Sequence, residues 1–418
     1  MTSMITCLLA TCLSFQYDAP VIRTPQLTPT DISSQMPKGA IMPQLGDSRL
    51  WQFSIDIGVN TLQTPNNERP FRMPLITEGP WSRLSIQSLE VISANGNDPV
   101  SMLEGNTALK GSGIQGEKMI QAPLTNGPQR FSTVSISAEV ASWNSKVNEE
   151  MAAMINWPAE WPSEAKAALL PQVLIESDEQ IFKDALQSLF GPNLRLNRPW
   201  VVAKAITQYT CTNIRVTGAR MMRAGRGQLR GLNVQGALAT SQSGIGSRAD
   251  LTCVCVAMLR AAGIPARPVI GLSADVESGD ELTTWAEFYL PDSGWVPFSP
   301  WEMQKSGVRS WKIDRSWRYF GNWSDLNNNI PLSWSFAPGD GSTAHDTWAL
   351  WGWTRAVPGV EFPIPNPGKG RAPGNQPVQY TPSGFLSKLR SGGTLNLRKM
   401  QQWLSGETRP VHQRTRSR

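Results

Sequence analysis

Apolar and polar residues alternate along several runs in the first third of this chain. The runs LWQFSIDIGV, WSRLSIQSLEVISA and RFSTVSISAEVASW lie between residues 49 and 145, and clusters of Pro, Asn, Gly and Asp separate them. Alternation with a period of two places every second side chain on the same face of a strand, and closely spaced turns are typical of antiparallel sheets. We therefore predict an all-β sandwich over residues 49–150.

The pattern changes to helical spacing after this region. Apolar residues recur every three to four positions over residues 177–190, so we assign residues 151–194 to a helical connector. Residues 216–246 are rich in Gly, Ser and Arg and are expected to form a long loop. A further helix is expected to begin near Ser247, because Ser247 and Asp250 have the spacing of a capping box before the apolar run LTCVCVAMLRAAG.

The length of 418 residues exceeds what one hydrophobic core usually contains, which predicts more than one domain. A hydrophobic content of 40%, with 17 Trp, is typical of a globular protein and not of a disordered one. The remaining predicted parts are a signal peptide over residues 1–16, a linker over residues 17–48, a second folded domain over residues 195–340, and a Trp/Pro/Gly-rich segment with a basic tail over residues 341–418.

The N-terminal apolar run MITCLLATCLSF, residues 4–15, has the length of a signal peptide and is too short to span a bilayer as a lone helix. It predicts export to the periplasm or the extracellular space. A cytoplasmic protein with a buried N-terminal strand, or a misplaced start codon, is the alternative. No other stretch of the sequence is long and apolar enough to predict a membrane span.

The Cys and His content argues against metal and cofactor sites. The five Cys and two His form no Cys-x-x-Cys motif and no mixed cluster, so we expect no metal and no cofactor. Cys211, Cys253 and Cys255 lie outside the predicted leader, and an odd number of cysteines is no disulfide framework. A net charge of +6 over 418 residues is too weak to predict a nucleic-acid partner. Nothing in the sequence indicates an oligomeric state.

Two strings in the second half of the chain form a specific combination. AMLRAAGIPARPVIGL covers residues 257–272, and TTWAEFYLPDSGWVPFSPW covers residues 283–301. Together they resemble the core of bacterial transglutaminase-like proteins, in which Gly-Ile-Pro-Ala-Arg ends a helix, His-Ala-Trp-Ala-Glu lies on a strand, and Gly-Trp-Val-Pro-Val-Asp-Pro follows a turn. The resemblance implies an α+β fold, with a papain-type domain over residues 195–340 that follows the β-sandwich.

The resemblance also implies acyl transfer by a Cys, a His and an Asp, and this chain departs from the pattern at all three positions. The Cys position of Gly-x-Cys-x-Asp is Arg248, the His position before Trp285 is Thr283, and the Asp position is Ser299. A guanidinium stays protonated and is no nucleophile, a Thr hydroxyl is no base near neutral pH, and a Ser has no charge to stabilise an imidazolium. We therefore predict a catalytically degenerate pseudoenzyme.

Two alternatives to the pseudoenzyme stay open. One is an active cysteine peptidase or acyl transferase with a relocated nucleophile, for which Cys253 or Cys255 and a base such as His345 would be needed. Both of these cysteines lie well inside a predicted helix, where free Cys usually packs as a small hydrophobic residue. The other alternative is an exported protein with a purely structural role.

An arginine at the start of a helix, with the free amide groups there, would attract a carboxylate, a phosphate or an acidic polymer. We therefore hypothesise a pocket for a peptide, an anionic ligand or a protein partner, formed by Arg248, Asp250, Trp285, Glu287 and Trp301. In the competing interpretation, Arg248 forms a structural ion pair with Asp250 or Glu287. The further Trp residues either form a binding platform or pack in the core.

Overall fold

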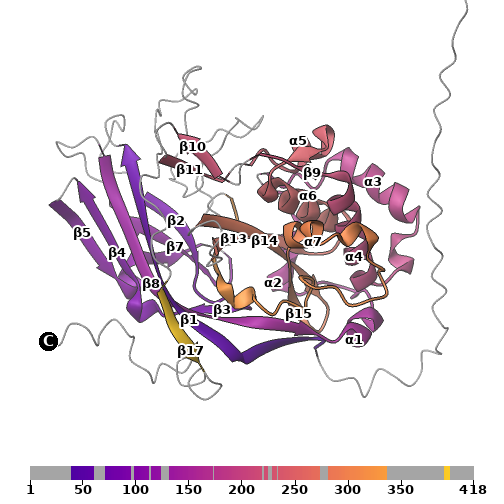
Figure 1. Ribbon diagram of the computed structural model, residues 1–418, viewed down its shortest axis with the longest axis horizontal. Coiled ribbons are helices and arrows are strands. Elements are labelled where there is room, and N and C mark those ends of the chain that lie inside the picture. The colour runs from indigo at the N-terminus through magenta and orange to yellow at the C-terminus, as the bar shows by residue number, and fades with distance from the viewer. Residues whose placement is uncertain are drawn as a thin grey trace, which may run out of the picture. The chain divides into compact units, whose positions relative to one another are not determined.

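The structure is a computed structural model, and it describes residues 39–60, 71–95, 98–112, 114–123, 131–172, 174–218, 221–224, 228–232, 234–273, 281–336 and 390–395. The predicted leader and most of the predicted linker lie outside these residues. Helices and strands form a mixed architecture, so the predicted α+β class is confirmed (Figure 1). No helix within the described ranges is long and apolar enough to cross a membrane.

Antiparallel strands form the N-terminal part of the chain, as the alternating pattern predicts. The larger sheet has the order β17-β1-β8-β4-β5, and β3 also pairs with β8. Its strands are β1 (Ile41–Asn60), β3 (Ser82–Leu84), β4 (Glu90–Asn95), β5 (Asp98–Glu104), β8 (Phe131–Val147) and β17 (Arg390–Leu395). A second sheet has the order β2-β7-β6 and contains β2 (Phe71–Ile76), β6 (Leu109–Gly111) and β7 (Glu117–Ala122).

Two boundaries differ from the sequence prediction. Strand β1 begins at Ile41, within the residues predicted as a linker, and its first residues pair with the end of β8, where Ile41 lies opposite Val147. Strand β17 lies within the predicted C-terminal segment and pairs with β1, where Ser48 lies opposite Leu395. Both differences have the same cause. Neither segment has a clear strand pattern of its own, and each becomes a strand because it pairs with a long neighbouring strand.

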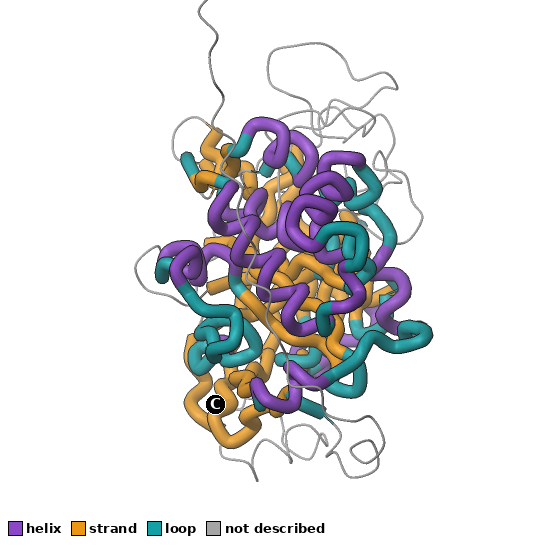
Figure 2. Tube along the Cα trace, turned by 90° about the vertical axis from the view of Figure 1, so that its right-hand side faces the viewer, coloured by secondary structure: helices purple, strands orange, loops and turns teal. Residues whose placement is uncertain are grey.

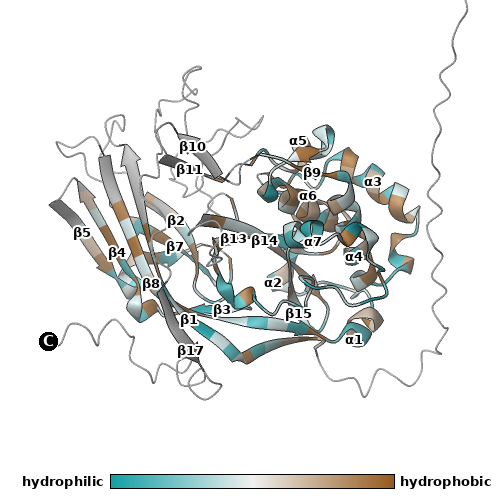
Figure 3. Cartoon of the chain, in the orientation of Figure 1, coloured by the Kyte–Doolittle hydropathy of each residue, from teal (hydrophilic) through white to brown (hydrophobic). Residues whose placement is uncertain are grey.

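Bands of hydrophobic and hydrophilic residues alternate along β4 (Figure 3), and β8 follows the same rule. In β8, Val134, Ile136 and Ala138 are buried on one face. These residues belong to one continuous hydrophobic core that also includes residues of the second sheet and of the helices. The N-terminal strands are therefore packed against the rest of the chain through apolar contacts.

The helices lie in front of the strands in the view of Figure 2. They are α1 (Glu149–Met154), α2 (Ser163–Lys166), α3 (Gln180–Phe190), α4 (Pro199–Asn213), α5 (Ala237–Ser243), α6 (Arg248–Ala261) and α7 (Pro300–Lys305). Short 3-10 helices cover Ile86–Ser88, Gly105–Ala108, Ala167–Leu169, Leu194–Leu196, Val308–Ser310 and Leu326–Asn328.

The predicted long loop over residues 216–246 is wrong in part. It contains the hairpin of β10 (Met221–Ala224) and β11 (Gln228–Leu232), then α5, and it ends in β12 (Ile245–Gly246), which pairs in parallel with β9 (Arg215–Val216). Glycine and serine lower the intrinsic preference for helix and strand, and pairing with neighbouring segments overrides that preference here.

A four-stranded antiparallel sheet supports the site described below. Its order is β15-β14-β13-β16, with β13 (Ala266–Ser273), β14 (Glu281–Leu290), β15 (Gly294–Phe298) and β16 (Asn329–Ser333). Helix α6 packs against β13 and β14 and is buried from Ala249 to Arg260. Its start has the predicted capping box, because the Ser247 hydroxyl accepts from the Asp250 N–H and the Asp250 carboxylate accepts from the Ser247 N–H.

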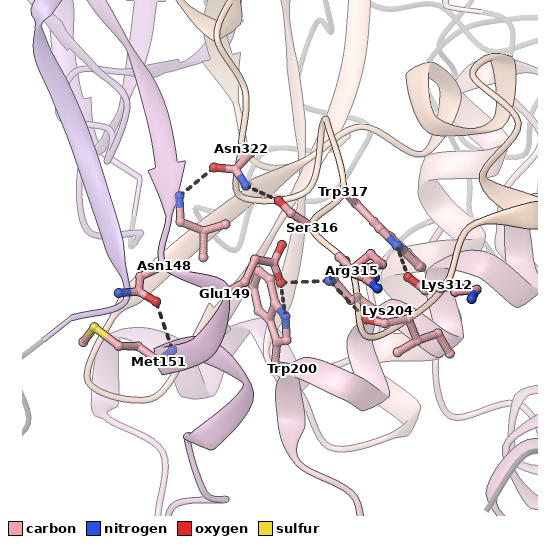
Figure 4. A network of polar contacts seen from close by, with 12 residues as sticks. Asn148, Glu149, Met151, Trp200, Lys204, Lys312, Arg315, Ser316, Trp317 and Asn322 are labelled. Atoms are coloured by element: carbon pink, nitrogen blue, oxygen red, sulfur yellow. Dashed lines mark hydrogen bonds and ion pairs between the residues drawn. The ribbon is translucent and has the colours of Figure 1, made fainter. Parts of the chain in front are cut away.

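A buried lysine joins α4 to α1 and to the loop after α7 (Figure 4). Lys204 Nζ lies 2.8 Å from Glu149 Oε2, and it also donates to the backbone oxygens of Arg315 at 2.7 Å and Ile313 at 3.3 Å. The Trp200 indole N–H donates to the same Glu149 oxygen. Burial lowers the pKa of Lys204, and the hydrogen bond and charge of Glu149 oppose that shift.

We expect Lys204→Met to lower the free energy of unfolding by about 2 kcal/mol, because hydrogen bonds to a buried charge are lost and the Glu149 carboxylate loses its cation. Urea unfolding followed by circular dichroism measures the change. Lys183→Met on α3 is the matched control, because Lys183 is exposed and such substitutions usually change stability by no more than about 0.5 kcal/mol. Equal effects of the two variants would contradict this account of the network.

Candidate functional site

The first site residue is Arg248, which opens α6 and is half-buried. Its guanidinium carbon lies 4.3 Å from the ring centroid of Trp301, a residue of α7. A cation over an indole face is held by the ring quadrupole, so this contact fixes the position of the guanidinium without neutralising its charge.

Thr283 and Ser299 approach the same place from the sheet side. Thr283 lies on β14 opposite Gly271 of β13. Ser299 precedes α7 and caps it, since its hydroxyl accepts from the N–H of Glu302 at 3.3 Å. A Cβ on Gly271 would lie 2.3 Å from the Ile330 oxygen and 2.7 Å from the Trp285 ring. Glycine at this position of β13 therefore lets the backbone of β16 and the Trp285 ring approach closely.

Arg248, Thr283 and Ser299 line one cavity of about 440 Å³, together with Trp285 and Trp301. The structure thus brings together the three positions at which the sequence departs from the Cys, His and Asp pattern. Among the described residues that line the cavity, none is a Cys or a His. The chemistry available on its walls is that of a guanidinium, an ammonium group, hydroxyls, amides, carboxylates and indole rings.

Asp250 and Glu287, which the sequence placed in the pocket, are not among the residues that line it. One Asp250 oxygen accepts from the backbone N–H groups of Gln235 and Gly236, at 2.7 and 3.0 Å. Burial raises the pKa of Asp250, while these N–H groups and that of Ser247 lower it. Its role is to hold the segment before α5 against the start of α6. Arg248 forms no ion pair with either acid, so its suggested structural pairing with them is wrong.

Glu287 instead pairs with Arg267 inside the four-stranded sheet. The Nε and Nη2 atoms of Arg267 both lie 2.8 Å from Glu287 Oε2. The guanidinium lies between the rings of Trp295 and Trp334, at 3.7 and 3.6 Å from their centroids. Burial lowers the pKa of Arg267 and raises that of Glu287, and the charge of each partner opposes the other's shift.

A second buried carboxylate approaches this pair from the N-terminal part of the chain. Glu117 opens β7, and one of its oxygens accepts from the backbone N–H of Trp334 at 3.0 Å and from the Ser333 hydroxyl at 3.4 Å. Burial raises its pKa to about 7, although the Trp334 hydrogen bond and the charge of Arg267 oppose the shift. Sequence reasoning missed Glu117, because it lies at a turn with no motif around it.

None of the cysteines among the described residues lines the cavity. Cys253 and Cys255 are fully buried in α6, and Cys211 of α4 is buried with its thiol donating to the Pro300 oxygen at 3.3 Å. Burial raises the pKa of Cys211 and Cys253 well above that of a free thiol. His345 and His412 lie outside the described residues.

The described Trp side chains near the site mostly pack in the core. Trp285, Trp317, Trp323 and Trp334 are buried, and the Trp285 and Trp323 rings meet edge-to-face at 6.3 Å. These four therefore form no exposed platform. Trp301 is the half-buried ring at the cavity, and its face carries Arg248.

The site includes charged residues that sequence reasoning did not select. Glu302, Lys305 and Asp325 also line the cavity. Glu302 and Lys305 lie three and six residues after Ser299 on α7, so their closeness in the sequence is the signal that could have identified them. Asp325 reaches the cavity only because the chain returns to it after a long irregular segment, and no sequence pattern signals that return.

Comparison with known proteins supports the assignment of this region. The model of the transglutaminase-like superfamily matches residues 196–300, a segment that contains Arg248, Thr283 and Ser299. The chain therefore contains a transglutaminase-like domain, as the two sequence strings predicted. No curated protein sequence matches the chain significantly.

Several solved structures have a partial similarity to this chain. A candidate cysteine protease from Cytophaga hutchinsonii has 15% identity and a TM-score of 0.44, over 70% of this chain and 83% of that one. The periplasmic domain of TgpA from Pseudomonas aeruginosa, bound to ethylmercury, has 15% identity and a TM-score of 0.28, over 65% of this chain and 99% of that one. A candidate protease from Parabacteroides distasonis has 11% identity and a TM-score of 0.21, over 59% of this chain and 63% of that one.

Proposed function

We propose that this protein is a transglutaminase-like domain protein that binds a ligand in its cleft and does not catalyse acyl transfer. The observation that carries the proposal is the cavity at which Arg248, Thr283 and Ser299 meet. Acyl transfer by this type of fold needs a thiolate, an imidazole that accepts and returns its proton, and a carboxylate that orients the imidazole. The three positions supply a permanently protonated guanidinium and two hydroxyls instead.

A relocated nucleophile is disfavoured by the positions of the thiols. A catalytic Cys must be accessible to its substrate and must have a thiolate at working pH, which requires a lowered pKa. Cys253 and Cys255 are 0% exposed and Cys211 is 5% exposed. Burial raises the pKa of Cys211 and Cys253, which is opposite to the shift that a nucleophile needs.

Native-state alkylation tests this part of the proposal. We expect iodoacetamide to leave Cys211, Cys253 and Cys255 unmodified in the folded protein and to modify all three in urea. Peptide mapping by mass spectrometry separates these sites from Cys7 and Cys12, and the urea sample is the positive control. Rapid and selective modification of one of the three in the native state would support a relocated nucleophile and contradict the proposal.

A further inference from the structure

We infer that the cavity binds a small zwitterion of the amino-acid type, with its carboxylate on Arg248 and its ammonium group toward Asp325. The inference rests on the proposed function, since it needs a cleft that binds and does not react. It is carried by the distribution of charge on the walls of the cavity and by the partners that each charged group already has.

Arg248 is a cation at the cavity without a carboxylate partner among the described residues. Two acids were expected near Arg248, and both have other partners. Asp250 accepts from backbone N–H groups, and Glu287 pairs with Arg267. The contact with the Trp301 ring holds the guanidinium but leaves its charge in place. A planar guanidinium with free N–H groups matches the two oxygens of a carboxylate.

The other charged groups on the walls argue against a multiply charged anion. Lys305 also lines the cavity, but Glu302 lies 2.9 Å from its ammonium group and adds a negative charge to the same wall. Asp325 also lines the cavity, and its carboxylate would repel a second negative charge on the ligand. A single carboxylate at Arg248 is therefore favoured over a phosphate dianion or an acidic polymer.

Asp325 itself is the group that would receive a cation. Its nearest cation is Arg318 at 3.7 Å, a loose contact in which the two side chains are 43% and 62% exposed. Exposed pairs of this kind contribute little and are easily replaced. An ammonium group on the ligand could therefore approach the Asp325 carboxylate while the ligand carboxylate is held by Arg248.

Size and hydrogen-bonding groups agree with a small polar ligand. The cavity volume of about 440 Å³ lies in the usual range for small-molecule pockets, about 300–1,000 Å³. Thr283 and Ser299 offer hydroxyls on the same walls. Ser299 uses an oxygen lone pair to cap α7, so its O–H remains available to donate to a ligand.

Isothermal titration of the full chain with the common free amino acids, one at a time at millimolar concentration, tests the inference. We expect at least one to bind, and we expect its decarboxylated amine and its N-acetyl derivative to bind more weakly. Arg248→Gln should weaken binding of the zwitterion about 10- to 100-fold, the usual effect of losing a charge-assisted hydrogen bond. Asp325→Asn should weaken binding of the zwitterion but leave that of the N-acetyl derivative unchanged.

The matched control is Arg195→Gln. Arg195 also lies over an indole ring, that of Trp157 at 4.7 Å, but it does not line this cavity. Circular dichroism confirms that each variant is folded. The inference is overturned if no free amino acid binds, if inorganic phosphate or polyglutamate binds better than any amino acid, or if Arg248→Gln and Arg195→Gln have equal effects. Binding of phosphate or polyglutamate in the cavity would overturn the inference but leave the proposed function intact. Cys-dependent turnover of a bound peptide would refute the proposed function itself.

Discussion

Replacement of Arg267 by alanine is expected to lower the free energy of unfolding by about 3–5 kcal/mol, the usual cost of removing one partner of a buried ion pair. Glu287 is 2% exposed and would keep a buried carboxylate without its cation. The Trp295 and Trp334 rings would also lose the guanidinium that lies between them. Urea unfolding followed by Trp fluorescence and by circular dichroism measures the loss.

The double variant Arg267→Met with Glu287→Leu is the control for this prediction. Removing both charges leaves no carboxylate at position 287 without its cation, so the double variant should be clearly more stable than Arg267→Ala alone. If the double variant instead loses as much free energy of unfolding as the single variant, or more, the loss would come from packing around the pair and not from the unpaired carboxylate. A single variant that loses less than about 1 kcal/mol would contradict the burial of the pair.

Glu117→Gln is expected to stabilise the protein at pH 8 by up to about 3 kcal/mol, since one pKa unit corresponds to about 1.4 kcal/mol. The pKa of Glu117 is raised from 4.5 to about 7. Between these values the folded protein holds a proton that the unfolded chain has released, so the stability contributed by this group falls as pH rises and is lost above pH 7. At pH 5 and below, the difference between variant and wild type should be small.

The measurement is the free energy of unfolding of wild type and Glu117→Gln at several pH values from 4.5 to 8.5. The difference between the two proteins isolates Glu117 from other groups with raised pKa, such as Asp250 and Glu287, which both proteins share. Glutamine retains an oxygen that can accept from the backbone N–H of Trp334. A difference that does not change with pH would show that the pKa of Glu117 is the same in the folded and the unfolded protein.

The parts of the fold that depend on local signals could be predicted from the sequence. The capping box of α6 involves residues three positions apart, so Ser247 and Asp250 identified the start of the helix. Strand β14 was expected because the motif around Trp285 resembles one that lies on a strand in a family, and the motifs of that family located Arg248, Thr283 and Ser299. The structure adds that these three positions line one cavity.

Contacts between segments that are far apart in the sequence could not be predicted. Asp250 was expected in the pocket, but its second set of partners comes from Gln235 and Gly236, in a region read as a loop. Glu117 lies near Arg267 only because β7 packs close to the four-stranded sheet, and no periodic pattern encodes that packing. The motif contains Glu287, but nothing in the sequence indicates that Glu287 pairs with Arg267 of the preceding strand.

Restoration of the three positions tests the central claim most directly. The variant Arg248→Cys with Thr283→His and Ser299→Asp should keep the fold, because Asp caps helix starts as well as Ser does. Hydrolysis of peptide amide and ester substrates is compared between this variant, wild type, and wild type with Cys211, Cys253 and Cys255 each replaced by Ala. The account predicts no turnover by wild type above the uncatalysed rate, and thiol-dependent turnover by the restored variant. Turnover by wild type that disappears with one of the Cys→Ala changes would contradict it.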